Sequence, residues 1–191
     1  VLFRSPIMLS GDTLKASMAV MNRLPPGGKG ISTIMLEKMV HAGNIIMPAT
    51  DSTRGETYDA YSRRIDTLSL LSVFDKETSG GETRYRAKDS VGAKWLTIGP
   101  LEEYSPKFNF ILQRIRNAEG CIFIYTRFVS GGAIPLGLAL EANGYTAHGR
   151  KSSLLMNGIQ AAGGRQCALC PRKEREHGNA SHAFAPAYYG M

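Results

Sequence analysis

The sequence predicts an α/β fold, in which part of a parallel sheet is flanked by helices. Three observations over residues 105–146 predict it. An amphipathic helical pattern comes first, and a short apolar run at residues 121–126 follows it. A glycine turn then leads into a second helical pattern. Helices and strands that alternate through short connections are typical of a parallel sheet.

The first part of the chain is predicted to be mainly helical. Apolar residues recur at helical spacing within 12–24, 32–41 and 58–74, and the Pro/Gly run at 25–30 separates the first two helices. Methionines are common on the predicted faces, and we interpret them as core filler because Met packs adaptably. The residues expected to face inward are Leu14, Met18, Met21, Met35, Met39, Val40, Tyr61, Ile65, Leu68 and Leu71.

Shorter elements follow this helical part. Residues 44–48 are expected to be extended and residues 78–81 to form a turn, while 84–88 and 94–98 are expected to be short strands or irregular. The alternation of arginine and tyrosine at 84–86 suggests nucleic-acid contact, although a solvated strand face is the favoured interpretation. Trp95 is interpreted as a packing residue.

The helix after residue 104 has a clear start. Ser105 can cap it and Pro106 suits its first position, because the missing N–H of proline has no helical partner there. The apolar face is expected to consist of Phe108, Ile111, Leu112 and Ile115. Gly120 can end the helix in a left-handed conformation.

The run Cys121–Thr126 combines apolar, aromatic and β-branched residues, which predicts a buried strand. The next helix is expected to open at Pro135, to bury Leu136, Ala139 and Leu140, and to close at Gly144, before another strand begins at Tyr145–Thr146. Glu141 near the end of that helix is electrostatically unfavourable, which hints at a tertiary partner.

One candidate site lies where the predicted strand 121–126 ends. Ligands of open α/β sheets bind beyond the carboxyl ends of the strands. The residues expected there are Tyr125, Thr126, Arg127, Phe128, Ser130, Gly131 and Gly132. Backbone N–H groups at the following helix start can face a phosphate. The structural alternative is a tight strand-to-helix bend, with Arg127 paired to a carboxylate.

A second candidate site is a metal site near the C-terminus. Its four candidate ligands are Cys167, Cys170, His177 and His182. A Cys-x-x-Cys turn brings two thiolates to one ion, and two histidines can complete a tetrahedron. A closed four-ligand site is structural, so we expect zinc to fold this segment without catalysing a reaction. The alternative is two free thiols and two surface histidines.

Basic residues surround these candidate ligands, and they are Arg165, Arg172, Lys173 and Arg175. A folded zinc knuckle would therefore present positive charge that suits phosphate groups. Glu174 and Glu176 dilute that charge, so a solvated rim is the alternative. No strand–Cys-x-x-Cys–helix pattern surrounds the cysteines, which argues against a redox role.

The chain has 191 residues, a net charge of +7 and a pI near 9.5. The positive charge favours polyanionic partners, with DNA or RNA first, although a basic surface alone gives the same total. Its three cysteines make no disulfide framework, so we expect a reducing intracellular compartment. No apolar run reaches membrane-spanning length and no signal peptide is visible, so no membrane partner is expected.

The stretch 104–145 resembles the start of the second RecA-like domain of superfamily 2 (DEAD/DEAH-like) helicases of nucleocytoplasmic large DNA viruses. Ser105-Pro106-Lys107, the strand ending in Tyr125-Thr-Arg-Phe128, and Ala139-Leu-Glu-x-x-Gly-Tyr145 carry the resemblance. The segment from Gln166 to Tyr188 resembles a Cys/His insert of those proteins. The convincing match runs from about residue 44 to residue 191. Viral factories or virion interiors are the compartments that this resemblance implies.

The resemblance implies an ATP-dependent helicase or translocase that uses ATP and Mg, with residues 125–128 at its nucleic-acid and interdomain face. The chain would be a fragment that lacks the first RecA-like domain and the rest of the second. No phosphate-binding Gly-x-x-x-x-Gly-Lys-Ser/Thr loop is present, and Gly27–Gly30 is interpreted as a turn. No Asp-Glu pair follows a hydrophobic strand to hold magnesium. The fragment is therefore not expected to hydrolyse ATP alone.

The expected organisation has four parts. Residues 1–5 are expected to be a translation artefact, and 6–103 a helical interdomain or linker region. Residues 104–150 would be the first αβαβ part of a RecA-like domain, and 151–191 a flexible insert with the zinc knuckle. The alternative function is a non-catalytic basic α/β module that binds nucleic acid and holds structural zinc. A sugar-nucleotide transferase domain is a third, less favoured interpretation, because no acidic ribose-binding residue is well placed.

Overall fold

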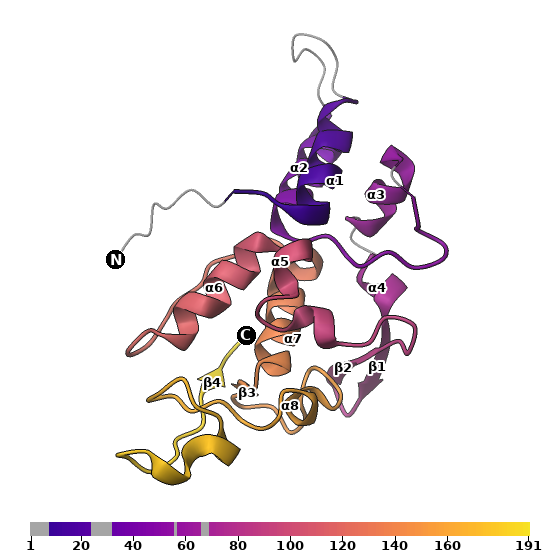
Figure 1. Ribbon diagram of the computed structural model, residues 1–191. Helices are drawn as coiled ribbons and strands as arrows, with labels where there is room; N and C mark the ends of the chain where they lie inside the picture. The colour runs from indigo at the N-terminus through magenta and orange to yellow at the C-terminus, as the bar shows by residue number, and fades with distance from the viewer. Residues whose placement is uncertain (1–7, 24–31, 56, 66–68) are drawn as a thin grey trace.

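The computed structural model describes residues 8–23, 32–55, 57–65 and 69–191. Three N-terminal helices gather at one end of the molecule, and they are α1 (Gly11–Met21), α2 (Thr33–Asn44) and α3 (Tyr58–Arg64) (Figure 1). The C-terminal loops form the opposite end. Helices combined with small sheets are compatible with the predicted α/β class. However, both sheets found in the described residues have only two strands, so a RecA-like parallel sheet is not seen there.

The three N-terminal helices surround a small core of their own. Its buried residues are Ala16, Val20, Ala42, Ile46, Tyr61 and Ile65. The predicted inward face of α1 was wrong, because Leu14, Met18 and Met21 are all exposed. The buried face carries Thr13, Ala16 and Val20 instead. These smaller side chains allow α1 to pack closely on its neighbours.

The inward face predicted for α2 is confirmed in part. Met35 and Met39 pack against the small core, whereas Val40 is exposed. A buried arginine on α3 ties the unit together: the Arg64 guanidinium donates to the Met47 carbonyl at 2.7 Å and pairs with Asp12 of α1. Residues 45–50 form no helix or strand, and Asn44, which was predicted to be extended together with 45–48, is the last residue of α2.

The single helix predicted over 58–74 was wrong. Helix α3 ends at Arg64, and a one-turn helix α4 (Leu70–Val73) follows. Leu71 on α4 is exposed, and the predicted inward residue Leu68 lies outside the described residues. The chain then enters a hairpin of β1 (Phe74–Ser79) and β2 (Glu82–Ala87), of which only β2 was predicted.

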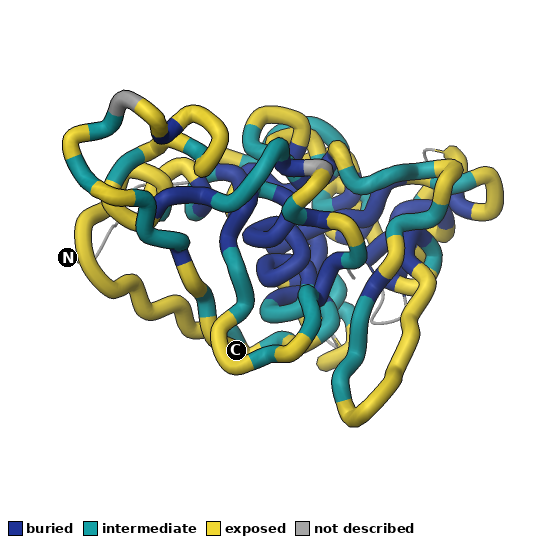
Figure 2. Tube along the Cα trace, turned by 90° about the horizontal axis from the view of Figure 1, so that it is seen from below, coloured by how far each residue is buried: buried dark blue, intermediate teal, exposed yellow. Residues whose placement is uncertain are grey.

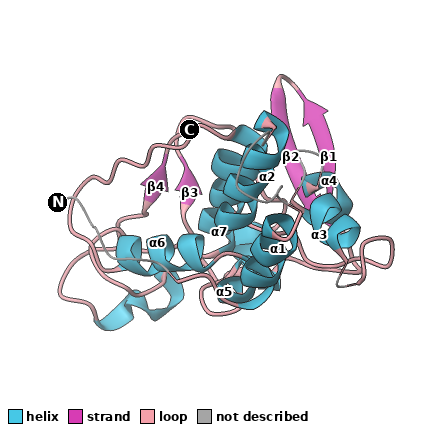
Figure 3. Ribbon diagram, turned by 90° about the horizontal axis from the view of Figure 1, so that it is seen from above, coloured by secondary structure: helices cyan, strands magenta, loops and turns pink. Residues whose placement is uncertain are grey.

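The hairpin register runs from Phe74 opposite Ala87 to Ser79 opposite Glu82. The turn between these strands consists of Gly80 and Gly81, whose φ angles are +57° and +81°. Positive φ at both positions is the requirement of the tightest hairpin turn, and glycine meets it without strain. The hairpin projects from the body of the molecule (Figure 3).

Helix α7 (Ile134–Ala142) lies at the centre of the larger core. Eight of its residues, 135–142, are buried. A helix that is apolar on all sides is expected at the centre of a core. The buried residues gather around it in Figure 2. The larger core draws on residues from the segments 6–103, 104–150 and 151–191, including Ile45, Leu112 and Leu155.

Helix α6 (Pro106–Arg116) confirms its predicted start and apolar face, but it ends at Arg116 and not at Gly120. The Ser105 hydroxyl accepts a hydrogen bond from the Phe108 N–H at 3.0 Å, and Phe108 and Leu112 are buried. Helix α5 (Leu101–Tyr104) precedes it, and a 3₁₀ turn η2 (Lys94–Leu96) buries Trp95, in agreement with its predicted packing role. Residues 94–98 therefore form no strand.

The buried strand predicted at residues 121–126 was wrong. The segment forms no strand in the described chain, and Phe123 is 90% exposed. Its composition favours a strand, yet a strand needs a neighbour to pair with. Among the strands of the described residues, the parallel pair is instead the two-residue β3 (Thr146–Ala147) beside β4 (Tyr188–Tyr189) (Figure 3).

Glu141 of α7 is fully buried and has the tertiary partners that its position predicted. Its carboxylate accepts hydrogen bonds from the Leu154 N–H at 2.9 Å, from the Leu155 N–H and from the Tyr189 hydroxyl at 2.9 Å. Burial raises the pKa of Glu141, and these hydrogen bonds only partly offset that effect. Glu141 thus joins the central helix to both parts of the C-terminal segment.

The part predicted to be a flexible insert, 151–191, contains a short helix, α8 (Gly158–Ala161), which contacts α7. Residues 1–5 and the turn at Gly27–Gly30 lie outside the described residues.

Candidate metal centre

The C-terminal segment is anchored on α7 by main-chain hydrogen bonds. The Gln166 N–H donates to the Gly144 carbonyl at 2.8 Å, just after α7 ends. The Ala187 N–H donates to the Gln166 carbonyl at 2.9 Å, and the Thr146 N–H donates to the Ala187 carbonyl at 2.9 Å. The chain between Gln166 and Ala187 is therefore a loop that is closed at its base.

The two cysteines lie in a tight hairpin within this loop. Gln166 and Lys173 form an antiparallel bridge, and the Cys167 N–H donates to the Arg172 carbonyl at 3.1 Å. The side chain of Gln166 is buried inside the turn. Its amide nitrogen lies 3.2, 3.0 and 3.3 Å from the carbonyl oxygens of Cys167, Cys170 and Arg172. Gln166 therefore holds the Cys-x-x-Cys turn from within.

The two histidines come from the other half of the loop. His177 lies on a 3₁₀ segment, η4 (Glu174–Asn179), and is buried. Its ring packs edge-on against the rings of His182 and Phe184, with centroid distances of 4.8 and 5.4 Å. His182 is half-buried and follows five residues later.

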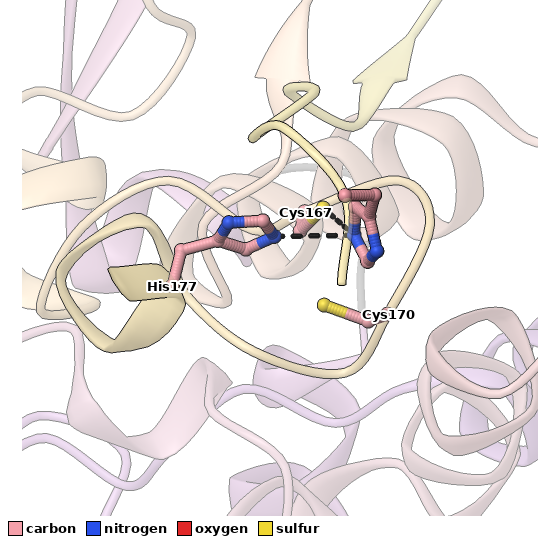
Figure 4. Close-up of side chains that lie close together, drawn as sticks. Cys167, Cys170 and His177 are labelled. Carbon is pink, nitrogen blue, oxygen red and sulfur yellow. Dashed lines mark hydrogen bonds between the residues drawn. The ribbon is translucent and has the colours of Figure 1, made fainter. Parts of the chain in front are cut away.

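All four predicted ligands converge. One donor atom from each of Cys167, Cys170, His177 and His182 lies within 4.8 Å of the other three. The His182 Nε2 atom lies 3.1 Å from the His177 Nε2 and 3.5 Å from the Cys167 Sγ. In Figure 4 the labelled side chains of Cys167, Cys170 and His177 point toward one another.

The spacing of these donor atoms fits a small tetrahedral ion. With Zn–N bonds of about 2.0–2.1 Å and Zn–S bonds of about 2.3 Å, neighbouring donors of a zinc tetrahedron lie roughly 3.3–3.8 Å apart. The two distances from His182, 3.1 and 3.5 Å, are close to this range. The two donor atoms that lie furthest apart must approach each other by about 1 Å for zinc to bind. The set can therefore hold a metal ion.

The electrostatics of Cys167 suit metal binding. Burial opposes ionisation of its thiol, but several hydrogen bonds stabilise the thiolate. They come from the Ala185 and Leu169 N–H groups, from His182 and from Cys170, and together they lower the pKa of Cys167 to about 6. A thiolate is the form of cysteine that binds metal.

The charge around the centre is mixed, as the sequence suggested. Arg165 forms an ion pair with Glu174 at 2.5 Å, and its guanidinium lies 5.4 Å from the centre of the Phe184 ring. The ammonium of Lys173 donates to the Ala162 carbonyl, and burial lowers the pKa of Lys173. Arg172 and Arg175 are exposed. The positive charge that remains on the rim therefore comes mainly from these two arginines.

The other predicted site is an exposed segment that leads into a tight turn. Tyr125 is 81% exposed, Arg127 is exposed, and Thr126, Phe128 and Ser130 are partly buried. The segment borders a hollow of about 260 Å³ against α6. Lys107 of α6 also lines the hollow, and its ammonium donates to the Asn44 side chain at 2.7 Å.

Gly131 and Gly132 have a structural role in a π-helical turn (η3, Val129–Ala133). A Cβ atom on Gly131 would overlap the ring of His41, and one on Gly132 would overlap the Thr126 hydroxyl. The His41 ring also packs on Phe128, with 4.4 Å between their centroids. The bend is therefore set by close packing, and the predicted alternative of an Arg127–carboxylate pair is not seen in the described residues. Arg127 lies over the Phe128 ring instead, at 5.2 Å.

Sequence reasoning missed the role of Gln166 because its function depends on the fold. The signal available was its position directly before the Cys-x-x-Cys turn, where a long amide side chain can reach the turn carbonyls. Phe184 was also missed as a ring that orients His177.

Comparison of this chain with protein-family models, with curated proteins and with solved structures gives no match. The resemblance to superfamily 2 helicases therefore stays a prediction. Within the described part of the chain, every helix is too short or too polar to cross a membrane.

Proposed function

We propose that this chain is a non-catalytic nucleic-acid-binding module whose C-terminal loop is held by a structural zinc ion. The observation that carries the proposal is the convergence of Cys167, Cys170, His177 and His182 on one point. Two thiolates and two imidazoles are a ligand set that suits zinc. Four protein ligands leave no open position for a reacting water, so the role that fits is structural.

The loop also has a reason to need zinc. Beyond the ligands and Gln166, much of its surface is exposed: Leu169 at the hairpin tip is 66% exposed, and residues 174–176 are exposed. So small a segment buries too little apolar surface to order itself, and a metal supplies the missing stabilisation.

Two features support nucleic acid, either DNA or RNA, as the partner. The first is the net charge of +7, which favours a polyanion. The second is the segment 123–127, where Phe123 and Tyr125 are 90% and 81% exposed beside the exposed Arg127. Exposed aromatic rings next to cationic groups can stack on unpaired bases while the cations contact phosphates. A single strand is the form of nucleic acid that offers such bases.

The helicase hypothesis requires residues 121–126 to lie inside a motor-type sheet. Since the described segment is exposed and unpaired, no structural observation favours the motor over the binding module. ATP, Mg and a partner RecA-like domain therefore stay predictions that derive from the resemblance alone.

The test is fluorescence anisotropy of labelled single-stranded DNA and RNA oligonucleotides, titrated with the zinc-loaded chain at several salt concentrations. We expect an affinity that falls steeply with salt, because counterions are released on binding. Tyr125→Ala should weaken binding roughly tenfold, because stacking contributes about 1–3 kcal/mol per base.

Arg127→Ala should reduce the salt dependence, because it removes one phosphate contact. Arg54→Ala is the matched control, since Arg54 has the same charge and its side chain is 77% exposed in the N-terminal part. Binding that is absent at low salt, or equal losses for the Arg127 and Arg54 variants, would contradict the proposed interface.

A further inference from the structure

A hollow of about 260 Å³ lies beside the exposed residues Tyr125 and Arg127, which also line it. Helices α2, α6 and α7 and the turn η3 contact one another around it. Its walls are mainly apolar, and they include Phe108, Ile124 and Leu136. A drug-sized ligand needs a pocket of about 300–1,000 Å³, so this hollow suits a single small ring system.

Asn44 is the buried polar residue of the hollow and is only 6% exposed. The Lys107 ammonium donates to its side-chain oxygen at 2.7 Å. Because an ammonium can only donate, this contact fixes which way the Asn44 amide is turned. The amide N–H groups have no hydrogen-bond partner in the part of the chain that the structure describes. They are therefore available to a ligand.

The other charged groups of the hollow are donors too. Lys107 uses one of its three N–H groups on Asn44. Arg127 lies over the Phe128 ring and forms no ion pair with a described residue. The Thr126 hydroxyl is engaged by the main chain of Phe128. None of the described residues that line the hollow is acidic. A ligand that fits must therefore bring hydrogen-bond acceptors.

Guanine combines a flat apolar ring system with the required edge. Its O6 and N7 atoms are adjacent acceptors, and lysine or arginine binds this pair in the commonest base-specific contact. Adenine has nearly the same shape but carries an N6–H₂ donor in place of O6, which would face the donors of Asn44 and Lys107. Thymine offers one acceptor on the corresponding edge, and cytosine offers a donor.

We propose that the hollow binds one guanine base, with O6 and N7 toward Asn44 and Lys107. This inference rests on the proposed function and deepens it, because the base would belong to a single strand that stacks on Tyr125. The same chemistry could also come from a free guanine nucleotide. In either case the sugar and phosphate stay outside, near Arg127, since the hollow has room for little more than the base.

The test is competition fluorescence anisotropy with the zinc-loaded full chain. The competitors are deoxyadenosine strands of about nine nucleotides, within the usual site size, that differ only in the central base. Guanine and hypoxanthine should each bind about tenfold more tightly than adenine, because both carry O6 and N7. Hypoxanthine lacks the N2 amino group of guanine, so it isolates the contribution of the O6/N7 edge.

Asn44→Asp keeps the shape of the side chain and its pairing with Lys107, but it replaces the amide N–H₂ group with an accepting oxygen. The preference should therefore reverse and favour adenine, whose N6–H₂ group can donate to that oxygen. Loss of the fold cannot produce such a reversal.

Lys107→Met removes the ammonium and should bring the ratio of guanine to adenine affinity close to one. Lys76→Met is the matched control, because it removes the same charge from an exposed position on β1. It should keep the wild-type ratio.

Guanosine and adenosine monophosphates, used as competitors, separate the two sources of the base. Guanosine monophosphate that displaces the probe as well as the guanine strand would assign the site to free nucleotide. Displacement by the strand alone would assign it to nucleic acid.

Three results would overturn the inference. They are equal affinity for the three strands, hypoxanthine that binds no better than adenine, and a guanine preference that survives both Asn44→Asp and Lys107→Met. Strand binding without base preference would count against the guanine site alone. Guanosine monophosphate binding without strand binding would count against the proposed function alone.

Discussion

The Nε2 atoms of His177 and His182 lie 3.1 Å apart, although the two residues belong to different parts of the C-terminal loop. His177 is on the 3₁₀ segment η4, whereas His182 lies in a bend of the chain that returns toward β4. The cysteine hairpin approaches the same point from the other side. A single ion at this point would therefore connect three separate parts of the loop.

The first prediction concerns Gln166, which holds the Cys-x-x-Cys turn from within. Gln166→Ala removes the amide nitrogen that reaches three turn carbonyls. Loss of such supporting hydrogen bonds typically lowers metal affinity by about 10–100-fold. Competition with a zinc chelator measures this change. Gln113→Ala on the exposed side of α6 is the control and should not alter affinity. Equal zinc affinity in the Gln166 variant and wild type would exclude this supporting role.

The second prediction concerns the buried carboxyl of Glu141. In Glu141→Gln an amide N–H group must face a donor, either an N–H of residues 154–155 or the Tyr189 hydroxyl. An unsatisfied buried donor costs about 1–3 kcal/mol, so urea unfolding should show a loss of that size.

The same carboxyl predicts a pH dependence. Burial raises the folded-state pKa of Glu141 above its unfolded value. The stability that this shift contributes is therefore fully present below the unfolded pKa, about 4.3, and is lost as the pH rises through the folded pKa. The stability advantage of wild type over Glu141→Gln should shrink between pH 4.5 and neutral pH (~7). An advantage that grows with pH would mean that the hydrogen bonds outweigh burial.

The third prediction concerns the start of α6. The Ser105 hydroxyl accepts from the Phe108 N–H and donates to the Asn44 carbonyl, and the residue is fully buried. Ser105→Ala should reduce the free energy of unfolding by about 1–3 kcal/mol, because it removes a cap and leaves a buried carbonyl unpaired. Ser32 caps α2 in an exposed position, so Ser32→Ala should cost only about 0.5–1 kcal/mol. Thermal unfolding of the two variants measures these losses of stability. Equal losses would contradict the claim that burial makes the Ser105 cap worth more than the Ser32 cap.

The fourth prediction compares two glycines. In Gly131→Ala the new methyl group would overlap His41, so we expect a loss of about 1–3 kcal/mol. Beyond the backbone of its own helix, a methyl group on Gly43 of α2 would meet no atom within 4 Å, and Gly43→Ala should stabilise the chain by roughly 0.5–1 kcal/mol. The two variants differ from wild type by the same single methyl group. In denaturant unfolding we expect the free energy of unfolding to fall for Gly131→Ala and to rise for Gly43→Ala. An unchanged free energy of unfolding for Gly131→Ala would show that His41 can move aside.

Local signals predicted part of the fold well. The Ser105 cap, Pro106 and the apolar spacing of α6 all act within a few residues, so their outcome did not depend on distant contacts. The same holds for the four metal ligands, because a Cys-x-x-Cys turn and two nearby histidines need only a short loop to meet.

Features that depend on distant parts of the chain were not predictable. The stretch 121–126 has a strand composition, but whether it is buried depends on a neighbouring strand that the described residues do not supply. On α1, two apolar faces compete, and the smaller residues Ala16 and Val20 are buried because of how closely the neighbouring helices approach. A turn was predicted over residues 78–81, but residues 78 and 79 belong to β1 and only Gly80 and Gly81 form the turn. Strand β1 was missed because Asp75, Lys76 and Glu77 are charged and exposed.

The central claim is that Cys167, Cys170, His177 and His182 bind one zinc ion, and native mass spectrometry of the full chain purified with zinc tests it most directly. We predict one zinc per chain for wild type and for His148→Ala, which removes an exposed histidine outside the cluster, and none for His182→Ala. A folded wild-type chain without zinc, or zinc retained by His182→Ala as fully as by wild type, would contradict it.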